Sequence, residues 1–357
     1  MFADLRIRSL KKMSEIKKAT INDVASLAGV SIKTVSRVVN GLPNVAEATR
    51  KRVNIAIERL NFRPNLSAQR LASRRSYILA LLYDNPSANY LFNIQSGVLE
   101  SCNARGYDLL VHPCDHTNPD LADEVINLQH QGRCDGVVLT PPLSDVRGLI
   151  SALDKKGTPF IQIAPADRQE NYPWVATTDE AASFEITHHL VSLGHRRIAF
   201  IRGHPDHKAM ATRENGYRRA LKDAGISYSR KLVAQGQNSF ESGVSAANQL
   251  LKKQDPPTAI FAANDDMAAG VISAANDMGL QVPKDLSVAG FDDTPIATQT
   301  WPALTTVRQP IREMAQSAAR ILIERLDSQD KPQLKEIIDA RLIVRLSTGT
   351  VNAVLRQ

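Results

Sequence analysis

The chain of 357 residues has only three cysteines and no apolar run that approaches the length of a membrane span. Cys102, Cys114 and Cys134 are odd in number and lack metal-site spacing, which predicts buried thiols in a reducing compartment. A membrane span needs about 20 apolar residues, and the basic residues 1–19 lack the apolar core of a secretory signal. These absences predict a cytoplasmic protein with no membrane partner.

The sequence also lacks the motifs of common catalytic sites. It contains no Gly-rich phosphate loop, no nucleophile elbow and no recognised set of metal ligands. Five histidines of the second half are not spaced as ligands: His188, His189, His195, His204 and His207. We therefore expect no catalytic residue, no metal and no cofactor, and we expect His195 to hold a helix-to-strand turn. A fold alone does not exclude catalysis.

The net positive charge of the chain comes from one end. Residues 1–75 hold 16 Lys and Arg against 5 Asp and Glu, a net charge of +11. From totals of 44 and 37, the remainder holds 28 against 32, a net charge of −4. Such a concentrated basic segment is typical of a protein that binds a polyanion. The length also leaves room for a two-lobed body of roughly 270 residues.

Residues 20–40, T-I-N-D-V-A-S-L-A-G-V-S-I-K-T-V-S-R-V-V-N, indicate two short helices joined by a turn. Thr20 and Asp23 have the spacing of a capping box, and Ser31 precedes the second helix as its cap. Gly29 permits the positive φ that ends the first helix. The pattern predicts a helix-turn-helix whose second helix enters the DNA major groove. The alternative is an ordinary helical hairpin with a solvated basic face.

The second of these helices has two different sides at about 100° per residue. One side carries a stripe of valines expected to be buried: Val35, Val38 and Val39. The other side carries the candidate base readers: Ile32, Lys33, Ser36 and Arg37. Lys and Arg pair with guanine edges, and an apolar side chain contacts a thymine methyl group. This side is therefore expected to read bases.

A third helix is expected over residues 46–60, with Thr49 and Arg50 near its start as phosphate partners. Pro64 breaks this helix. Residues 66–73 then indicate a short helix, which is too short to be stable alone. We expect this hinge to become helical when two copies meet on DNA; the alternative is a plain linker.

From residue 77 onward, apolar strands alternate with amphipathic helices. Expected strands of a first lobe cover residues 77–83, 107–112, 136–140 and 160–163, with helices near 90–105, 120–131 and 146–156. Expected strands of a second lobe cover residues 198–202, 259–263 and 286–291, and a final strand covers about 337–346. The alternation predicts an α/β fold with two parallel sheets. Ligands bind beyond the carboxyl ends of such strands, here in the cleft between the lobes.

Polar and aromatic residues that follow these strands are the candidate ligand-binding set. They are Asp84, Asn89, Tyr90, Arg213, Phe240, Asn264 and Asp292. Carboxylates, amides and a guanidinium bind vicinal hydroxyls, and aromatic rings stack on sugars or bases. Some residues of these loops have structural alternatives. Asp265 and Asp266 would cap a helix that begins at Met267, Asp293 and Thr294 would form a turn, and Tyr90 would be a core residue.

Several strings occur along nearly the whole chain in one order: T-I-N-D-V-A, A-G-V-S-I-K-T-V-S-R-V-V-N, T-R-K-R-V, N-F-R-P-N-L-S-A-Q-R-L, G-H-R-R-I-A-F-I, A-A-N-D-D-M-A, D-L-S-V-A-G-F-D-D and L-T-T-V-R-Q-P. In these strings the chain resembles the lactose-repressor/galactose-repressor (LacI/GalR) family of transcription factors. The resemblance implies a three-helix helix-turn-helix domain and a periplasmic-binding-protein-like body. It departs from the family at Ala46, where the family usually has a Ser or Thr cap, a change that costs about 1 kcal/mol of local stability.

The resemblance also implies roles for individual residues. Ala68 would enter the minor groove, Leu71 would wedge into the central base step of a palindromic operator, Arg213 and Asp292 would anchor the effector, and Phe240 would stack on it. The full expected DNA-binding set is Thr20, Ser31, Ile32, Lys33, Thr34, Ser36, Arg37, Asn40, Thr49, Arg50, Asn65, Ala68 and Leu71. The expected domains are an arm (1–17), the helix-turn-helix (18–63), the hinge (64–75), the body (76–347) and a tail (348–357). The lobes divide near residues 176, 308 and 336.

Three functions are compatible with this organisation. The first is a transcriptional repressor that binds operator DNA as a homodimer and responds to a small effector, a carbohydrate or its phosphate, with a nucleoside or purine as the rival. The second is a sugar-binding transport protein, which the body would allow but the helix-turn-helix and the missing export signal disfavour. The third is an enzyme, for which no motif is present. A dimer is expected because the tail lacks the leucine heptads of a helical bundle.

Overall fold

The computed structural model describes residues 19–39, 45–62, 75–85, 87–327 and 335–351. The chain forms two compact units, Met1–Arg75 and Ser76–Gln357. Among the described residues, no helix is long and apolar enough to cross a membrane.

The described residues of the first unit form three helices, α2 (Ile21–Ala28), α3 (Ile32–Val39) and α4 (Glu47–Arg59). The capping box of Thr20 and Asp23 is confirmed, and Gly29 ends α2 with φ 64°. The helices pack around Val24, Val35 and Val53, each fully buried. The apolar spacing of the sequence therefore produces the expected three-helix core.

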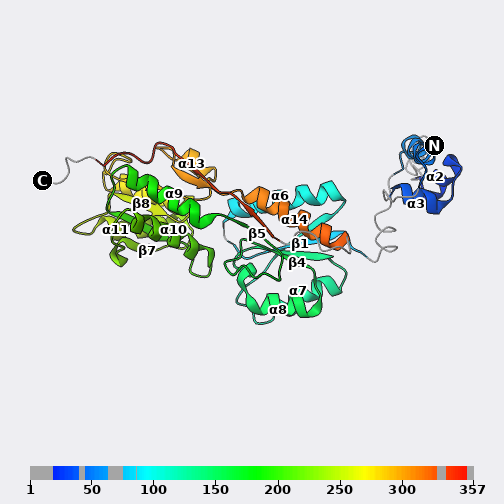
Figure 1. Cartoon of the computed structure of the whole chain (residues 1–357), viewed down its shortest axis with the longest axis horizontal. Coiled ribbons are helices and arrows are strands. Elements are labelled where there is room, and N and C mark those ends of the chain that lie inside the picture. The colour runs from blue at the N-terminus through cyan, green and yellow to red at the C-terminus, as the bar shows by residue number, and fades with distance from the viewer. Residues whose placement is uncertain (1–18, 40–44, 63–74, 86, 328–334, 352–357) are drawn as a thin grey trace, which may run out of the picture. The chain divides into compact units, whose positions relative to one another are not determined.

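The second unit has two lobes (Figure 1). The first lobe has a six-stranded parallel sheet in the order β11-β5-β4-β3-β1-β2. Its strands are β1 (Ile78–Tyr83), β2 (Asp108–Pro113), β3 (Gly136–Leu139), β4 (Phe160–Ile163), β5 (Trp174–Thr177) and β11 (Lys335–Ile338). One face packs against α6 (Ala88–Arg105) and α14 (Ile311–Asp327). The other packs against α7 (Leu121–His130) and α8 (Arg147–Lys156), and a 3-10 turn, η1, covers Leu143–Asp145.

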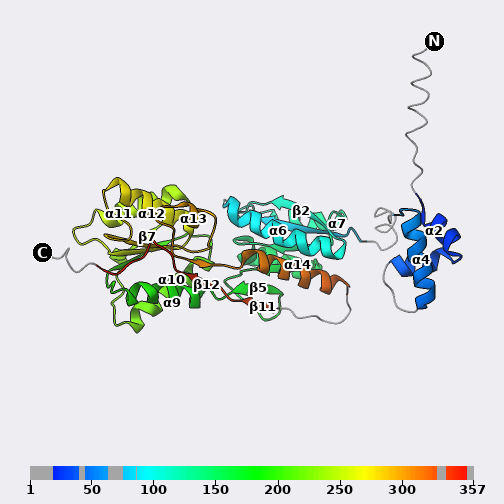
Figure 2. The ribbon, with the colours of Figure 1, turned by 90° about the horizontal axis from the view of Figure 1, so that it is seen from above.

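The second lobe has a four-stranded parallel sheet in the order β7-β6-β8-β9. Its strands are β6 (Ile198–Arg202), β7 (Val233–Gln235), β8 (Ala259–Ala262) and β9 (Ser287–Ala289). Helices α9 (Asp179–Ser192) and α10 (Ala209–Asp223) lie on one side, and α11 (Phe240–Leu251) and α12 (Asp265–Asp277) lie on the other (Figure 2). Two shorter pieces complete the lobe, the 3-10 turn η2 (Arg230–Leu232) and α13 (Ile296–Gln299).

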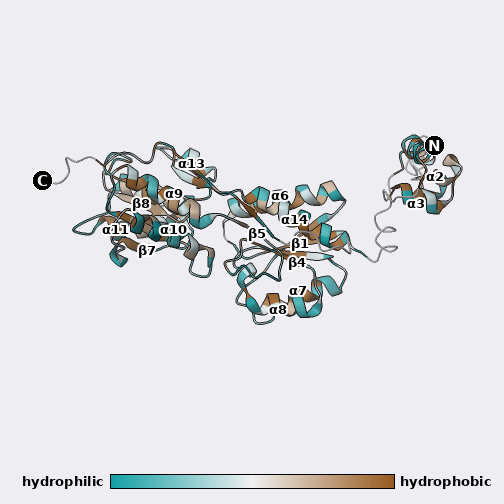
Figure 3. Cartoon of the chain, in the orientation of Figure 1, coloured by the Kyte–Doolittle hydropathy of each residue, from teal (hydrophilic) through white to brown (hydrophobic). Residues whose placement is uncertain are grey.

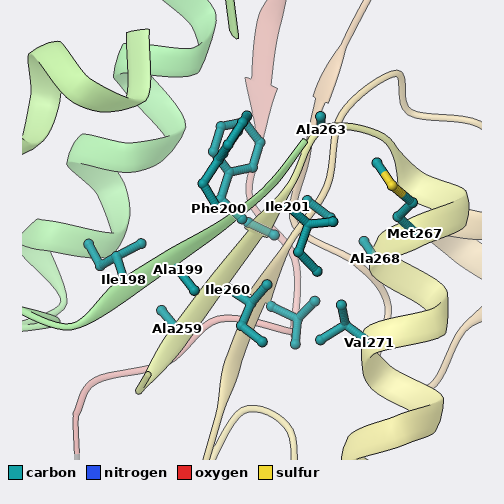
Figure 4. Packing of buried hydrophobic residues seen from close by; sticks show 14 of the residues in the cluster. Ile198, Ala199, Phe200, Ile201, Ala259, Ile260, Ala263, Met267, Ala268 and Val271 are labelled. Atoms are coloured by element: carbon teal, nitrogen blue, oxygen red, sulfur yellow. The ribbon is translucent and has the colours of Figure 1, made fainter. Parts of the chain in front are cut away.

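Apolar residues concentrate along the strands of both sheets (Figure 3). In the second lobe, Ile201 of β6 and Ile260 of β8 lie beside Ala268 and Val271 of α12 (Figure 4). All four residues are fully buried. This continuous core holds the carboxyl ends of the strands, and the loops that follow them, in fixed positions.

The chain passes between the lobes three times in the described part. It leaves β5 for α9 at residue 178, leaves β10 (Thr306–Arg308) for α14 at residues 309–310, and leaves β11 for β12 (Arg341–Ile343) at residues 339–340. Strands β10 and β12 pair antiparallel beside the second lobe. These crossings connect two lobes that have separate cores.

Several expectations about strands need correction. The final strand expected over 337–346 is two strands, because β11 belongs to the first sheet and β12 to the second lobe. Strands β5 and β7 were not expected from the sequence. Cys102 and Cys134 are buried as expected, but Cys114 is only half-buried.

Candidate ligand-binding cleft and DNA-reading helix

Arg213 of α10 is the centre of a buried charge cluster in the second lobe. Its side chain is 4% exposed, its Nε lies 3.5 Å from Oδ2 of Asp179, and its Nη2 lies 3.3 Å from Oδ1 of Asp292. Its Nη1 donates to the carbonyl oxygen of Ala263, and its Cζ lies 3.7 Å from the centroid of the Phe291 ring. The guanidinium therefore joins the loops after β8 and β9 to the start of α9.

Asp292 follows β9 in an unusual backbone conformation. Its φ is 107°, a value that costs a residue other than glycine about 1–3 kcal/mol. Its backbone N–H donates to the carbonyl oxygen of Val307 at 2.8 Å, which holds the conformation in place. Burial raises the pKa of Asp292 to about 7; Arg213 opposes this rise and the Asp179 carboxylate adds to it. The carboxyl group is therefore poised between its two protonation states near neutral pH.

Tyr90 of α6 faces this cluster from the first lobe. Burial raises the pKa of Tyr90 above its usual range, and the Asp292 carboxylate adds to the rise while Arg213 opposes it. Its hydroxyl is buried, and among the described residues it has no hydrogen-bond partner. An unpaired buried hydroxyl costs about 1–3 kcal/mol, which a bound polar ligand would recover. The ring of Tyr90 packs against the first-lobe core, as the structural alternative expects.

A second group of contacts connects the lobes near the ends of β1, β2 and β6. Nδ1 of His116 lies 2.6 Å from Oδ2 of Asp84, and its Nε2 lies 3.4 Å from Oδ2 of Asp206 in the other lobe. Nζ of Lys208 donates to the carbonyl oxygen of Asp145 at 3.4 Å. The structure thus has the two lobes in direct polar contact.

The remaining candidates lie on separate elements. Phe240 begins α11 and is 39% exposed, and Asn264 caps α12 by accepting from the N–H of Met267. The amide Nδ2 of Asn264 donates to the carbonyl oxygen of Asn238 at 3.0 Å. A Cβ at Gly270 would collide with the carbonyl oxygen of Phe240, so the close approach of α11 to α12 requires glycine there. Asn89 of α6 is half-buried.

Two acidic residues beside the cluster have contacts other than the helix cap and the turn that the sequence offered as alternatives. Asp265 does not cap a helix beginning at Met267, because α12 begins at Asp265 and Asn264 is its cap. Asp265 is fully buried and accepts hydrogen bonds from the N–H of Thr294 and the hydroxyl of Thr306. Asp293, besides its position in the turn, pairs with Arg308 at 2.7 Å and Arg345 at 2.6 Å.

His195 has the structural role expected of it. It is buried and contacts the hydroxyls of Thr258 and Ser287, both at 2.9 Å, and the carbonyl oxygen of Gly349 at 3.1 Å. Burial lowers its pKa. The imidazole therefore stays neutral and joins the start of β6 to the end of the described chain.

Several residues of the cleft were missed from the sequence: Asp179, His116, Asp206 and Asn238. Asp179 looks in the sequence like an ordinary acidic residue in the first turn of a helix. His116 and Asp206 follow β2 and β6. The rule that ligands bind beyond the ends of strands could therefore have identified them from the sequence. Contact between them depends on how the two lobes face each other, which no local pattern encodes.

A cavity of about 480 Å³ adjoins the Arg213 cluster through Asp179. It is lined by both lobes: Ala164, Pro165, Ala166, Arg168, Thr177, Thr178, Asp179, Glu180, Ala181, Ala209, Thr212 and Arg219. None of the seven candidates from the sequence lines it. The volume falls in the range of small-molecule sites.

The reading helix α3 has the two sides expected of it. Val35 and Val38 are buried, whereas Lys33 and Arg37 are exposed and Ile32 is 51% exposed. Val39, expected to be buried, is half-buried. An apolar side chain that remains half exposed beside two cations suits a groove with thymine methyl groups.

The other candidate DNA contacts differ in their surroundings. Ser31 caps α3 by accepting from the N–H of Thr34 at 3.1 Å, and Thr49 and Arg50 of α4 are half-buried. Ala46 makes no capping hydrogen bond, as its side chain implies. The remaining candidates lie outside the described residues: Asn40, Asn65, Ala68 and Leu71.

Comparison with known proteins covers both units. Residues 20–65 match the family model of bacterial regulatory proteins, lacI family, and residues 187–348 match the model of a periplasmic binding protein-like domain. The chain is 33% identical over 325 residues to catabolite control protein A of Priestia megaterium, covering 91% of this chain and 95% of that protein. It is 32% identical over 336 residues to the HTH-type transcriptional repressor PurR of Vibrio atlanticus, covering 94% and 100%.

Two solved structures are similar over nearly the whole chain. The lac repressor dimer bound to operator and the anti-inducer ONPF matches with a TM-score of 0.75 and 29% identity, covering 94% of this chain and 100% of that one. The transcriptional regulator CelR in complex with cellobiose matches with a TM-score of 0.71 and 31% identity, covering 92% and 99%.

Proposed function

The chain belongs to the LacI family of bacterial transcriptional regulators, and we propose that it is a homodimeric repressor controlled by an uncharged carbohydrate bound between its lobes. It is a DNA-binding protein, and its named relatives are regulators rather than enzymes. The observation that carries the proposal is the buried group of Arg213, Asp292 and Tyr90, which brings donors and acceptors of both lobes to one place.

The charges of this group favour an uncharged ligand over a phosphate. Arg213 is the buried cation, and Asp179 and Asp292 already neutralise it. A phosphate would bring further negative charge beside two carboxylates, which is unfavourable at short range. Sugar hydroxyls instead accept from Tyr90 and donate to Asp292, and the exposed ring of Phe240 offers a stacking surface. Cellobiose, the ligand of the CelR structure, is an uncharged sugar.

Control of DNA binding then follows as a linkage between two sites. A ligand that contacts both lobes favours one lobe angle, and the three chain crossings transmit that angle to the start of the body. Operator affinity changes by the difference in ligand affinity between the two angles, typically about 1–3 kcal/mol. Operator binding by a dimer, as in the lac repressor structure, makes the reading helices of two copies act together.

A thermal-shift screen followed by calorimetry tests the ligand class. It would compare uncharged mono- and disaccharides, their phosphates, and nucleosides on the full chain. We expect an uncharged sugar to bind and the matching sugar phosphate to bind at least tenfold more weakly. Tighter binding of the phosphate or of a nucleoside would overturn the ligand class. Fluorescence anisotropy with operator DNA, with and without the bound sugar, tests control; an unchanged operator affinity would overturn it.

A further inference from the structure

A separate cluster of ligating side chains lies at the edge of the first-lobe sheet. We call His112, Cys114 and Glu124 the edge cluster. Strand β2 is the outermost strand, and α7, which carries Glu124, is its neighbour (Figure 2). The N–H of Cys114 donates to the carbonyl oxygen of Tyr83 at 2.9 Å, so the ladder with β1 continues past the end of β2. His112 and Cys114, two residues apart, therefore face the same side.

The edge cluster brings three different ligand atoms together. Nε2 of His112 lies 2.7 Å from Oε1 of Glu124. One ligand atom from each of His112, Cys114 and Glu124 lies within 4.8 Å of the other two. The second carboxylate oxygen of Glu124 accepts from Nδ2 of Asn118 at 3.4 Å, which helps to orient the carboxylate. The Cys114 thiol has only a weak contact, 3.9 Å from Sγ to the carbonyl oxygen of His112.

These ligand types and distances suit one class of ion. A tetrahedral zinc ion binds imidazole, thiolate and carboxylate at about 2.0–2.3 Å, which places the ligand atoms roughly 3.3–3.8 Å apart. To reach that geometry, the 2.7 Å separation of His112 and Glu124 must lengthen by roughly 0.6 Å, and the distances to sulfur, each at most 4.8 Å, must shorten by at most about 1 Å. We propose that His112, Cys114 and Glu124 bind a zinc ion or a similar borderline-soft divalent cation, with water as the fourth ligand. This site uses different residues from the proposed carbohydrate cleft.

Metal binding here includes a proton release. Burial raises the pKa of the Cys114 thiol to about 12, and Glu124 adds to the rise, so the free side chain is the thiol. The metal ion forms the metal–sulfur bond as the S–H bond breaks, and the proton passes to solvent. The resulting thiolate and the Glu124 carboxylate balance the two charges of the ion.

The neighbouring group of Asp84, Asp115 and His116 is the competing location. Its ligand atoms also lie within 4.8 Å of one another. Asp115 already accepts from the N–H and hydroxyl of Thr117, at 2.8 and 2.6 Å, and His116 is held by Asp84 and Asp206. It also lacks a sulfur ligand, so a borderline-soft ion favours the edge cluster.

Titration of the metal-free full chain with Co²⁺ and competition by Zn²⁺ test the proposal. A thiolate–cobalt bond gives a charge-transfer band in the near ultraviolet, which a carboxylate site does not. We expect one Co²⁺ per chain with this band, displaced by Zn²⁺. Cys114→Ser should remove the band and weaken Zn²⁺ binding at least tenfold.

Three variants serve as controls. Cys134→Ser replaces a buried thiol outside the cluster and should leave the band unchanged. Glu124→Gln should weaken binding while leaving the sulfur bond and its band detectable at saturating Co²⁺. His116→Ala should leave binding unchanged. A missing band in the folded wild type, a band that persists in Cys114→Ser, or Zn²⁺ binding lost in His116→Ala but kept in Cys114→Ser would overturn the proposal.

Discussion

The DNA-reading helix and the ligand-binding cleft differ in how their side chains are held. On α3 the candidate readers Lys33 and Arg37 are exposed and lie within one helix of eight residues. In the cleft, Arg213 is buried, and its partners come from the start of α9 and from loops that follow two strands. The first site is local in sequence and free of packing, whereas the second is assembled from distant segments and is part of the core.

Side chains on the exposed face of α3 therefore contribute to binding but little to stability. Side chains buried in the cleft contribute to both. A side chain exposed on α3 can change without a cost to folding. A charged side chain within the cleft cannot, because its removal leaves the opposite charges buried and unpaired. Substitutions in the two regions are therefore expected to give opposite signatures in stability and binding measurements.

The largest expected effect is that of Arg213→Ala. Loss of the guanidinium leaves Asp179 and Asp292 buried without their partner, a change that costs about 3–5 kcal/mol of stability. Calorimetric unfolding of the ligand-binding unit should show this loss, together with loss of ligand binding. If the variant unfolded at the same temperature as the wild type, Arg213 would not contribute to stability, and the proposed difference between the cleft and α3 would be wrong.

Arg37→Ala is the matched arginine substitution on the reading helix. A bidentate contact to guanine contributes about 1–3 kcal/mol of base discrimination, so specific operator affinity should fall roughly 5- to 150-fold. Unfolding should be unchanged, because the side chain is exposed. Anisotropy titrations on operator and scrambled DNA measure the effect. Undiminished discrimination would show that Arg37 does not read a base.

Asp292→Asn tests the protonation of the cleft. The folded pKa of Asp292, about 7, lies above the ordinary value near 4. Its contribution to stability is therefore complete below pH 4 and is lost as the pH rises through 7. Since asparagine does not titrate, the variant should gain at least about 1 kcal/mol relative to the wild type between pH 5 and pH 8. Denaturant titrations across that range measure it; parallel pH profiles would contradict the raised pKa.

Phe240→Ala tests whether exposure alone explains the difference, because Phe240 is the exposed residue among the seven candidate ligand-binding residues. It should behave like a residue of the reading helix, with ligand affinity reduced by about 1 kcal/mol, or roughly fivefold, and stability nearly unchanged. Calorimetric ligand titration and thermal unfolding measure the two quantities. Phe240→Tyr, which keeps the ring, is the control. An equal loss of affinity in both variants would argue against stacking.

Local patterns in the sequence predicted much of the architecture. Strands Phe160–Ile163 and Ile198–Arg202 occur at their expected bounds, since each is a short apolar run between turn signals. The cap of α2 and the two-sided character of α3 were predicted because capping and helical periodicity depend only on residues three or four apart. Strand β11 was misassigned because its place in the first sheet depends on pairing with β5, about 160 residues earlier in the chain.

The sequence indicated where candidate site residues lie along the chain, but not which residues they contact. Asp84, Arg213 and Asp292 were selected as candidates because ligands bind beyond the carboxyl ends of parallel strands; Arg213 lies in α10 and not in the strand-end loop expected for it. Their partners were not identified. Asp179 lies 34 residues from Arg213, and His116 meets Asp206 only because two lobes with separate cores face each other.

The sequence by itself determined the helices of the reading unit, three helices of the first lobe, most strands and the family, because these depend on short-range periodicity, capping and charge. Only the tertiary structure decided which charges are buried together, which hydroxyl lacks a partner, and that His112, Cys114 and Glu124 meet at one sheet edge. Those properties depend on distances between segments far apart in the chain. Burial then sets the energy of each group, because the cost of an unpaired charge or hydroxyl rises steeply once water is excluded.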